Sequence, residues 1–320
     1  VAVTADGSVY MADPLNHQIR AVTPSGESLI VAGAGDGASG YSGENLPAVA
    51  SRLAGPTGLA YDPRTGAIWV ADRENDRLRH FVPGGRLYTM AGGGASTADA
   101  VPQATAARLA GPVGVAIAET GVVVFTEGTS GKVRRVAPDG ALSTIATLPG
   151  GRGGAIAARA ADGLVWAADG GRVWRVVPGA VPAIQAEPVL TLAGARVTGL
   201  AYDQAGSLFV SYTDADAGGR AGTRVARLAL GADGAAKPGA TPLLIAGSGG
   251  EDADDQAYAL APATDAVTQL LPGAGECSLF VDVAHAADPD RLSGLVYGGA
   301  SYESADGSVR WGQVFRLTPQ

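Results

Sequence analysis

The chain has 320 residues, a net charge of -8, and 46% apolar and 17% charged residues. Its length can bury a large core, as two ordinary domains or as one large all-β domain, and its apolar content excludes a disordered chain. Because the chain is acidic and no apolar run approaches the roughly 20 residues of a membrane helix, we expect neither nucleic-acid binding nor membrane insertion of this part.

Two closely related segments lie near the start of the chain. Residues 8–26 read SVYMADPLNHQIRAVTPSG, and residues 67–85 read AIWVADRENDRLRHFVPGG. Each contains an apolar run that ends in Ala-Asp, an Asn three residues later, a basic strand, and then Pro and Gly. Further copies follow, so the sequence divides into six units of about 53 residues, within the range of propeller blades.

Each unit contains four strand-like stretches, separated by the Gly and Pro residues that hairpin turns require. In the second copy these stretches are residues 58–62, 67–72, 77–82 and 86–92. Residues 68–71 are apolar on both faces, which is typical of a strand buried between stacked blades, and Gly58 and Ala60 suit a crowded ring centre. We therefore predict an all-β fold, a single six-bladed β-propeller of four-stranded blades over residues 1–320. The predicted blades are approximately 1–37, 55–94, 111–150, 151–194, 195–249 and 269–320.

Three linkers between units have Ala and Leu at helical spacing and then a Pro or Gly stop: residues 44–56, 100–112 and 261–273. We predict a short helix in each linker, with all three on one face of the ring beside the channel mouth. The last copy supplies only three strands, so we expect residues before Val1 or beyond Gln320 to close its blade. The chain would then be a processed product, or one module of a larger chain or complex.

Polar residues recur where the second strand of a unit ends. They are the carboxylates Asp13, Asp72, Glu127 and Asp169, with the amides Asn16 and Asn75 three residues after the first two. These side chains can hold the following turn: the carboxylates accept hydrogen bonds from it, and the amides accept or donate them. A catalytic residue is needed once, whereas a turn clamp is needed in every blade, so we predict a structural role for all six residues.

Arginines recur along the third strands, namely Arg20, Arg79, Arg135, Arg175, Arg227 and Arg316. A stripe of this kind can bind acidic ligands. The alternative, which we favour, is that the side-chain stems cover the strand surface while the charged heads lie in water.

An acidic loop is the first candidate for a metal site. Asp214 and Asp216 imitate the first half of a calcium loop, although Val225 stands where its closing Glu would be. A surface calcium site and a solvated acidic loop are therefore the two alternatives, and we expect no other cofactor.

The histidines are the second candidate. His17 and His80 belong to an ordinary turn and a third strand, so three rings from such different blade positions do not form a zinc site. His285 alone follows a first strand near the channel mouth, which makes it an alternative metal ligand, with Asp282 or Glu276 nearby. Cys277 is the only cysteine, so no internal disulfide can form, and we interpret it as a buried thiol.

The repeat resembles the NHL-repeat family, named after an Asn-His-Leu signature. The resemblance rests on NHQIR at residues 16–20, on NDRLR at residues 75–79, and on the Gly-rich linker 33–56, which is similar to linkers of bacterial and teneurin-type NHL propellers. It implies a toroid that binds proteins or ligands, although a few relatives are lyases. Residues 208–228 are also similar to one blade of quinone-dependent sugar dehydrogenases.

These features favour a non-catalytic propeller that binds another protein or a cell-surface component through the linker-bearing face. The alternative is a metal-dependent lyase, hydrolase or sugar oxidoreductase with its site at the channel mouth. Only two lysines accompany the many arginines, which indicates a GC-rich bacterial genome. We expect an extracytoplasmic location, in the periplasm, at the cell surface or secreted.

Overall fold

The computed structural model is all-β, and its only helices among the described residues are three single 3-10 turns. The described residues are 1–119, 121–179, 183–184, 187–203, 206–215, 221–247, 278–285, 294–303 and 310–317. In the last three of these ranges the backbone alone is described. No helix in the described part is long and apolar enough to cross a membrane.

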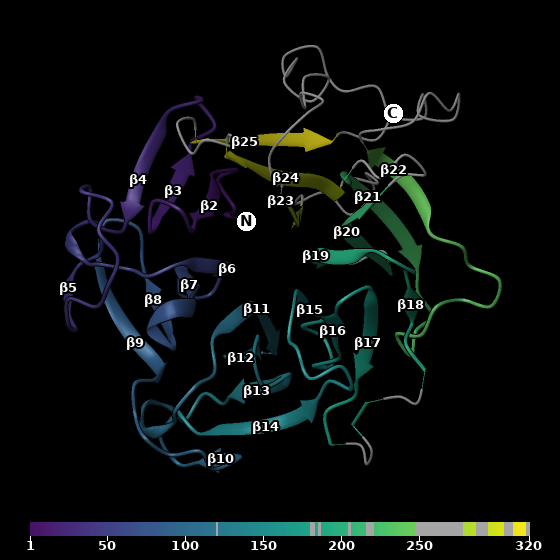
Figure 1. Cartoon of the computed structure of the whole chain (residues 1–320), viewed down its shortest axis with the longest axis horizontal. Coiled ribbons are helices and arrows are strands. Elements are labelled where there is room, and N and C mark those ends of the chain that lie inside the picture. The colour runs from purple at the N-terminus through teal and green to yellow at the C-terminus, as the bar shows by residue number, and fades with distance from the viewer. Residues whose placement is uncertain are drawn as a thin grey trace. The chain divides into compact units, whose positions relative to one another are not determined.

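The described strands form antiparallel sheets that follow one another in chain order (Figure 1). The first sheet contains β1 (Ala2–Val3), β2 (Val9–Asp13), β3 (Gln18–Val22) and β4 (Ser28–Ala32). The second contains β6 (Pro56–Asp62), β7 (Ala67–Asp72), β8 (Arg77–Phe81) and β9 (Arg86–Gly92), with β5 (Leu46–Pro47) beside β9. The third contains β11 (Pro112–Glu119), β12 (Val122–Glu127), β13 (Lys132–Val136) and β14 (Leu142–Thr147), with β10 (Ala100–Val101) beside β14.

Three further sheets complete the described strands. The fourth contains β15 (Ile156–Ala158), β16 (Val165–Asp169), β17 (Arg172–Val176) and β18 (Leu190–Thr191). The fifth contains β19 (Arg196–Tyr202), β20 (Ser207–Ala215), β21 (Ala221–Ala229) and β22 (Leu243–Gly247), and the sixth contains β23 (Ser278–His285), β24 (Gly294–Glu303) and β25 (Arg310–Leu317). The residues group into two compact units, Val1–Asp169 with Val173–Pro188, and Gly170–Arg172 with Val189–Gln320.

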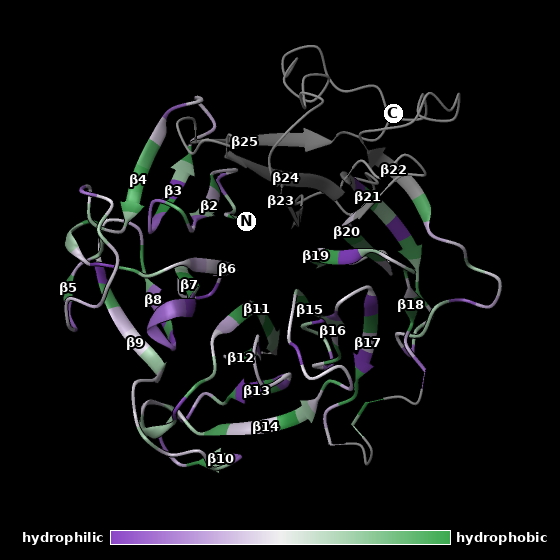
Figure 2. Ribbon diagram, in the orientation of Figure 1, coloured by the Kyte–Doolittle hydropathy of each residue, from purple (hydrophilic) through white to green (hydrophobic). Residues whose placement is uncertain are grey.

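The prediction of four strands in every blade is wrong, because the sheets contain three to five described strands. The two five-stranded sheets gain their extra strand from the linker that precedes them. Where the sequence predicts short helices in the first two linkers, the structure has the three-residue turns η1 (Ala48–Ala50) and η3 (Ala104–Ala106). The third linker lies outside the described residues. The turn η2 (Arg73–Asn75) joins β7 to β8 and is hydrophilic (Figure 2).

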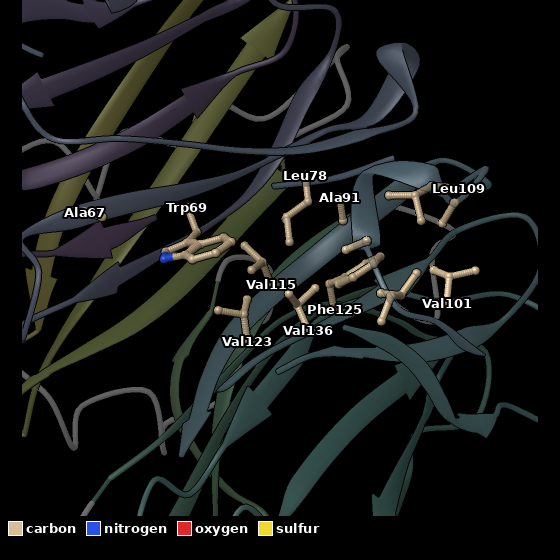
Figure 3. Close-up of a cluster of buried hydrophobic side chains, with 13 residues drawn as sticks. Ala67, Trp69, Leu78, Ala91, Val101, Leu109, Val115, Val123, Phe125 and Val136 are labelled. Atoms are coloured by element: carbon tan, nitrogen blue, oxygen red, sulfur yellow. The ribbon is translucent and has the colours of Figure 1, made fainter. Parts of the chain in front are cut away.

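Strand β7 is buried along its whole length, as its apolar sequence predicts. Ile68 and Val70 belong to one hydrophobic cluster with residues of the first sheet. Trp69, on the opposite face of the strand, belongs to a second cluster with Val115 and Phe125 of the third sheet (Figure 3). A strand whose two faces both contribute to hydrophobic cores has no polar face, so its sequence lacks the alternation of apolar and polar residues.

The first strands of consecutive sheets approach each other closely in the first unit. A methyl group on Gly58 would lie 2.4 Å from the carbonyl oxygen of Val113, and one on Gly114 would lie 2.7 Å from that of Gly154. The Thr57 hydroxyl donates a hydrogen bond of 2.9 Å to Val113 across the same junction. Glycine is therefore required at residue 58 because the two backbones meet there.

Candidate functional site

Asp72 lies at the end of β7 and ties the first linker to the turn that follows. Its side chain is fully buried and accepts hydrogen bonds from the backbone N–H of Ala54, at 2.7 Å, and from Asn75 Nδ2, at 2.9 Å. Asn75 also donates to the carbonyl of Gly40, at 2.7 Å. Two backbone segments of the linker are thus fastened to one turn by two side chains.

The other three carboxylates contact their turns in related ways. Asp13 accepts from the backbone and the side chain of Asn16, at 3.2 and 2.8 Å. Glu127 accepts from the hydroxyl of Ser130, which occupies the position of Asn16 and Asn75 in its repeat. Asp169 accepts from the backbone N–H of Gly150. Each of these carboxylates thus binds donors of its own turn or of the segment leading into its sheet.

The prediction of a charged head in water is wrong for Arg79, which is buried beneath the first linker, as Arg134 is beneath the second. Arg79 is 0% exposed and Arg134 is 2% exposed. Arg79 Nη1 lies 3.6 Å from Asp72 Oδ2, and Arg134 Nη1 lies 3.2 Å from Glu127 Oε1. Strand register also pairs Val70 with Arg79 and Phe125 with Arg134, so the residue equivalent to Arg79 is Arg134, one place before the predicted Arg135.

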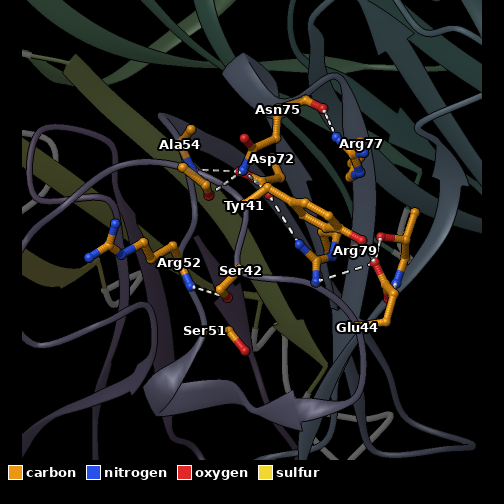
Figure 4. Close-up of polar contacts among 12 residues, drawn as sticks. Tyr41, Ser42, Glu44, Ser51, Arg52, Ala54, Asp72, Asn75, Arg77 and Arg79 are labelled. Carbon is orange, nitrogen blue, oxygen red and sulfur yellow. Dashed lines mark hydrogen bonds and ion pairs between the residues drawn. The ribbon is translucent and has the colours of Figure 1, made fainter.

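The first linker lies over Asp72 and Arg79 (Figure 4). The ring of Tyr41 lies 4.0 Å from the Arg77 guanidinium and 5.2 Å from that of Arg79, and its hydroxyl donates to Glu44 at 2.7 Å. Glu44 also accepts from the backbone N–H of Thr89 on β9. Partial burial raises the pKa of Glu44, but the hydrogen bonds from Thr89 and Tyr41 outweigh it and lower the pKa overall.

Buried leucines anchor both linkers from below. Leu53 is 0% exposed and Leu109 is 2% exposed, at equivalent positions of the repeated sequence Arg-Leu-Ala-Gly-Pro. The backbone N–H of Ala48 donates to Gly85, and that of Ala104 donates to Gly140, so each linker also binds the hairpin turn of the sheet that follows it. The loops are therefore fixed by packing and by main-chain hydrogen bonds.

The turns between second and third strands bind the beginning of the next sheet. His17 Nδ1 accepts a hydrogen bond of 3.0 Å from the backbone N–H of Gly55. Asp76, at the equivalent position, accepts one of 2.8 Å from the backbone N–H of Gly111. Both residues have left-handed backbone conformations, with φ of 55° and 50°. His17, which we predicted to lie in an ordinary turn, thus also joins two sheets; we call it and Asp76 junction residues.

The remaining predicted site residues are dispersed or lie outside the described part. His80 packs in a row between the rings of Trp69 and Tyr88, and burial lowers its pKa. Asp216 is outside the described residues, and only the backbone of Asp214 and His285 is described. The described side chains contain no group of three or more His, Cys, Asp or Glu that could hold a metal ion.

Comparison with known proteins supports the fold. Residues 53–81 match the NHL repeat, so the chain contains an NHL repeat over its second copy, including NDRLR at residues 75–79. No curated protein matches the sequence. A putative gluconolactonase of known structure is 15% identical, with a TM-score of 0.56, over 100% of this chain and 88% of that one.

Two other solved structures are similar over nearly the whole chain. A chain of a nidogen/laminin complex is 12% identical, with a TM-score of 0.56, over 98% of this chain and 96% of that one. A catalytically inactive virginiamycin B lyase from Staphylococcus aureus, with quinupristin, is 12% identical, with a TM-score of 0.52, over 99% of this chain and 79% of that one. At such identities the likeness concerns the fold alone, so the chain is an all-β propeller that contains an NHL repeat, and its function must be argued from its own residues.

Proposed function

We propose that this protein is a non-catalytic binding scaffold whose partner docks on the end of the first unit that carries the linkers. We call this the linker end: the two linkers, residues 33–55 and 93–111, the turns between second and third strands, and the segment 148–155 that leads from β14 to β15. The partner is another protein or a cell-surface component. The nidogen/laminin complex offers a precedent for a propeller of this fold in a protein assembly.

The observation that carries this proposal is the way the linkers are held. Each linker adds a strand to the sheet that follows it and buries a leucine, although linkers are ordinarily the least fixed part of a propeller. Side chains on such loops are nevertheless exposed, including Tyr41 at 42% and Val49 at 51%. A rigid loop that presents exposed aromatic and apolar groups loses little conformational entropy on binding.

The arrangement of the sheets and the location of the protein belong to the same proposal. Each described sheet then corresponds to one blade of a propeller. Such a scaffold would act outside the cytoplasm. The enzyme alternative depends on His285, Asp282 and Glu276, whose side chains lie outside the described part.

Site-specific photo-cross-linking tests the proposal. A photoreactive residue at Val49, on the first linker, is compared with one at Ala5, an exposed residue of the turn between β1 and β2. We expect a protein-sized adduct from position 49 in the native host and none from position 5. Native mass spectrometry of the chain isolated from its source tests the enzyme alternative. A bound metal or small organic molecule, together with no adduct at position 49, would contradict the scaffold proposal and favour an enzyme.

A further inference from the structure

We infer that the linker end recognises an acidic polypeptide segment through an arc of arginines, one or two at each junction between consecutive sheets. This inference rests on the proposed function and names the chemistry of the partner. The arc consists of Arg52, Arg73, Arg108 and Arg152, all of which are exposed.

The junctions place these arginines in order along the first unit. Arg52 precedes Gly55, which binds the turn of the first sheet through His17. Arg108 precedes Gly111, and a methyl group on Gly111 would lie 3.8 Å from Cγ of Arg73, so these two arginines share the second junction. At the third junction, a methyl group on Gly131 would lie 2.9 Å from the backbone nitrogen of Arg152.

The arc is cationic because few of its members are neutralised. Arg52 lies 3.4 Å from Asp36, and both side chains are about half exposed. No carboxylate lies within 4.0 Å of the Arg73, Arg108 or Arg152 guanidinium among the described residues. Free guanidinium groups on rigid backbone can bind carboxylates with two parallel hydrogen bonds.

The opposite turns of the first unit, which join first to second strands and third to fourth strands, have the reverse charge character. There Arg64 is paired with Asp62 at 3.0 Å, and Arg159 is paired with Asp162 at 2.6 Å. The turn residues Asp6, Glu27 and Asp139 are exposed and form no ion pair among the described residues. The linker end is therefore cationic relative to the opposite turns, although the chain as a whole carries -8.

Acidic groups among the arginines favour a polypeptide over a uniform polyanion. Asp36, Glu74 and Asp76 are all exposed at the linker end, so a chain with a charge on every unit would meet repulsion. A polypeptide can place carboxylates opposite the arginines and neutral or apolar groups elsewhere. The exposed ring of Tyr41, stacked on Arg77, suits apolar groups of such a partner.

Fluorescence anisotropy with a labelled peptide in which glutamates are interspersed with neutral and apolar residues tests this inference on the full chain. We compare Arg108→Gln/Arg152→Gln with the control Arg64→Gln/Arg159→Gln, which removes the same charge from the opposite turns. We expect the first variant to weaken binding by about three- to tenfold and the control to leave it nearly unchanged, because exposed ion pairs contribute little individually. Added salt should weaken binding to the wild type.

Several outcomes would overturn the inference. They are no binding at low salt, equal losses in both variants, or tighter binding of a sulfated polysaccharide than of the peptide. A salt-sensitive dimer in sedimentation, lost in Arg108→Gln/Arg152→Gln, would identify a second copy of the chain as the occupant instead. If a protein adduct forms at position 49 but the peptide does not bind, the scaffold proposal stands and the acidic class fails; if neither occurs, both fail.

Discussion

The buried carboxylate of Asp72 should make stability depend on pH in a direction opposite to that of ordinary surface carboxylates. Burial raises its pKa to about 6, and the hydrogen bonds from Ala54 and Asn75 and the charge of Arg79 offset this only in part. A group whose pKa is raised in the folded state stabilises the fold below the unfolded-state pKa, here 3.8, and this contribution is lost as the pH rises through about 6. The difference between these values corresponds to about 3 kcal/mol in total.

The substitution Asp72→Asn removes the ionisation and keeps the shape and an acceptor for the Ala54 N–H. Asn at this position leaves Glu44, at 3.8 Å, as the remaining ion-pair partner of Arg79 among the described residues, so the variant also changes stability at a fixed pH. The test is therefore the pH dependence of the difference between the two proteins. We expect the wild type to lose about 2 kcal/mol relative to the variant between about pH 4 and about pH 8.

Urea unfolding followed by tryptophan fluorescence measures this difference, since the chain contains four tryptophans. A difference in the free energy of unfolding that stays constant over this range would refute the reasoning. A difference that changes in the opposite direction would show that the ion pair with Arg79 outweighs burial.

Three further substitutions test the packing of the linkers and junctions, each measured by urea unfolding. Leu53→Ala, which removes a fully buried anchor, should lower the free energy of unfolding by about 2–5 kcal/mol, whereas Val49→Ala on the exposed side of the same linker should change it by less than about 0.5 kcal/mol. Gly58→Ala should lower the free energy of unfolding by about 1–3 kcal/mol because its new methyl group meets the Val113 backbone. Gly35→Ala is the matched control, since a methyl group there has no atom within 4 Å, and equal effects of the two substitutions would contradict the close approach at Gly58. His17→Ala should cost about 1 kcal/mol, and His17→Asp should retain most of the stability, because Asp76 performs the same role at the next junction; a loss as large in both would show that the acceptor is unimportant.

The strands of the repeat can be predicted from sequence because each has a characteristic length and is bounded by turn residues. The second copy is an example: the predicted stretches 67–72 and 86–92 are the observed β7 and β9. The apolar run in β7 also indicated burial on both faces, which the structure confirms. The predicted crowding at Gly58 is confirmed, since backbone atoms of the third sheet occupy the space beside it.

The linkers were not accessible in the same way. The strands β5 and β10 have two residues each, and two residues show no periodicity; their strand conformation depends on the edge of a sheet that is distant in sequence. The same is true of Arg79 and Arg134. Arginine is rarely buried, and their burial depends on Asp72 and Glu127 from a neighbouring strand together with a linker that covers them.

The position that joins two sheets can be His in one repeat and Asp in the next because its requirement is a backbone conformation and an acceptor. Position 17 and its equivalent, position 76, require a left-handed backbone and a side-chain acceptor for the N–H of the following glycine. At the third junction the equivalent residue is Gly131, with φ of 66°, and the backbones themselves come into close contact. Histidine in this position is thus one of several solutions to a backbone requirement, and its presence there indicates how sheets are joined. Three of the four arginines in the arc beside these junctions form no ion pair among the described residues. Their exposure beside rigid, repeated junctions is the basis for the proposed acidic partner, and exchange of Arg108 and Arg152 tests that role separately from the fold.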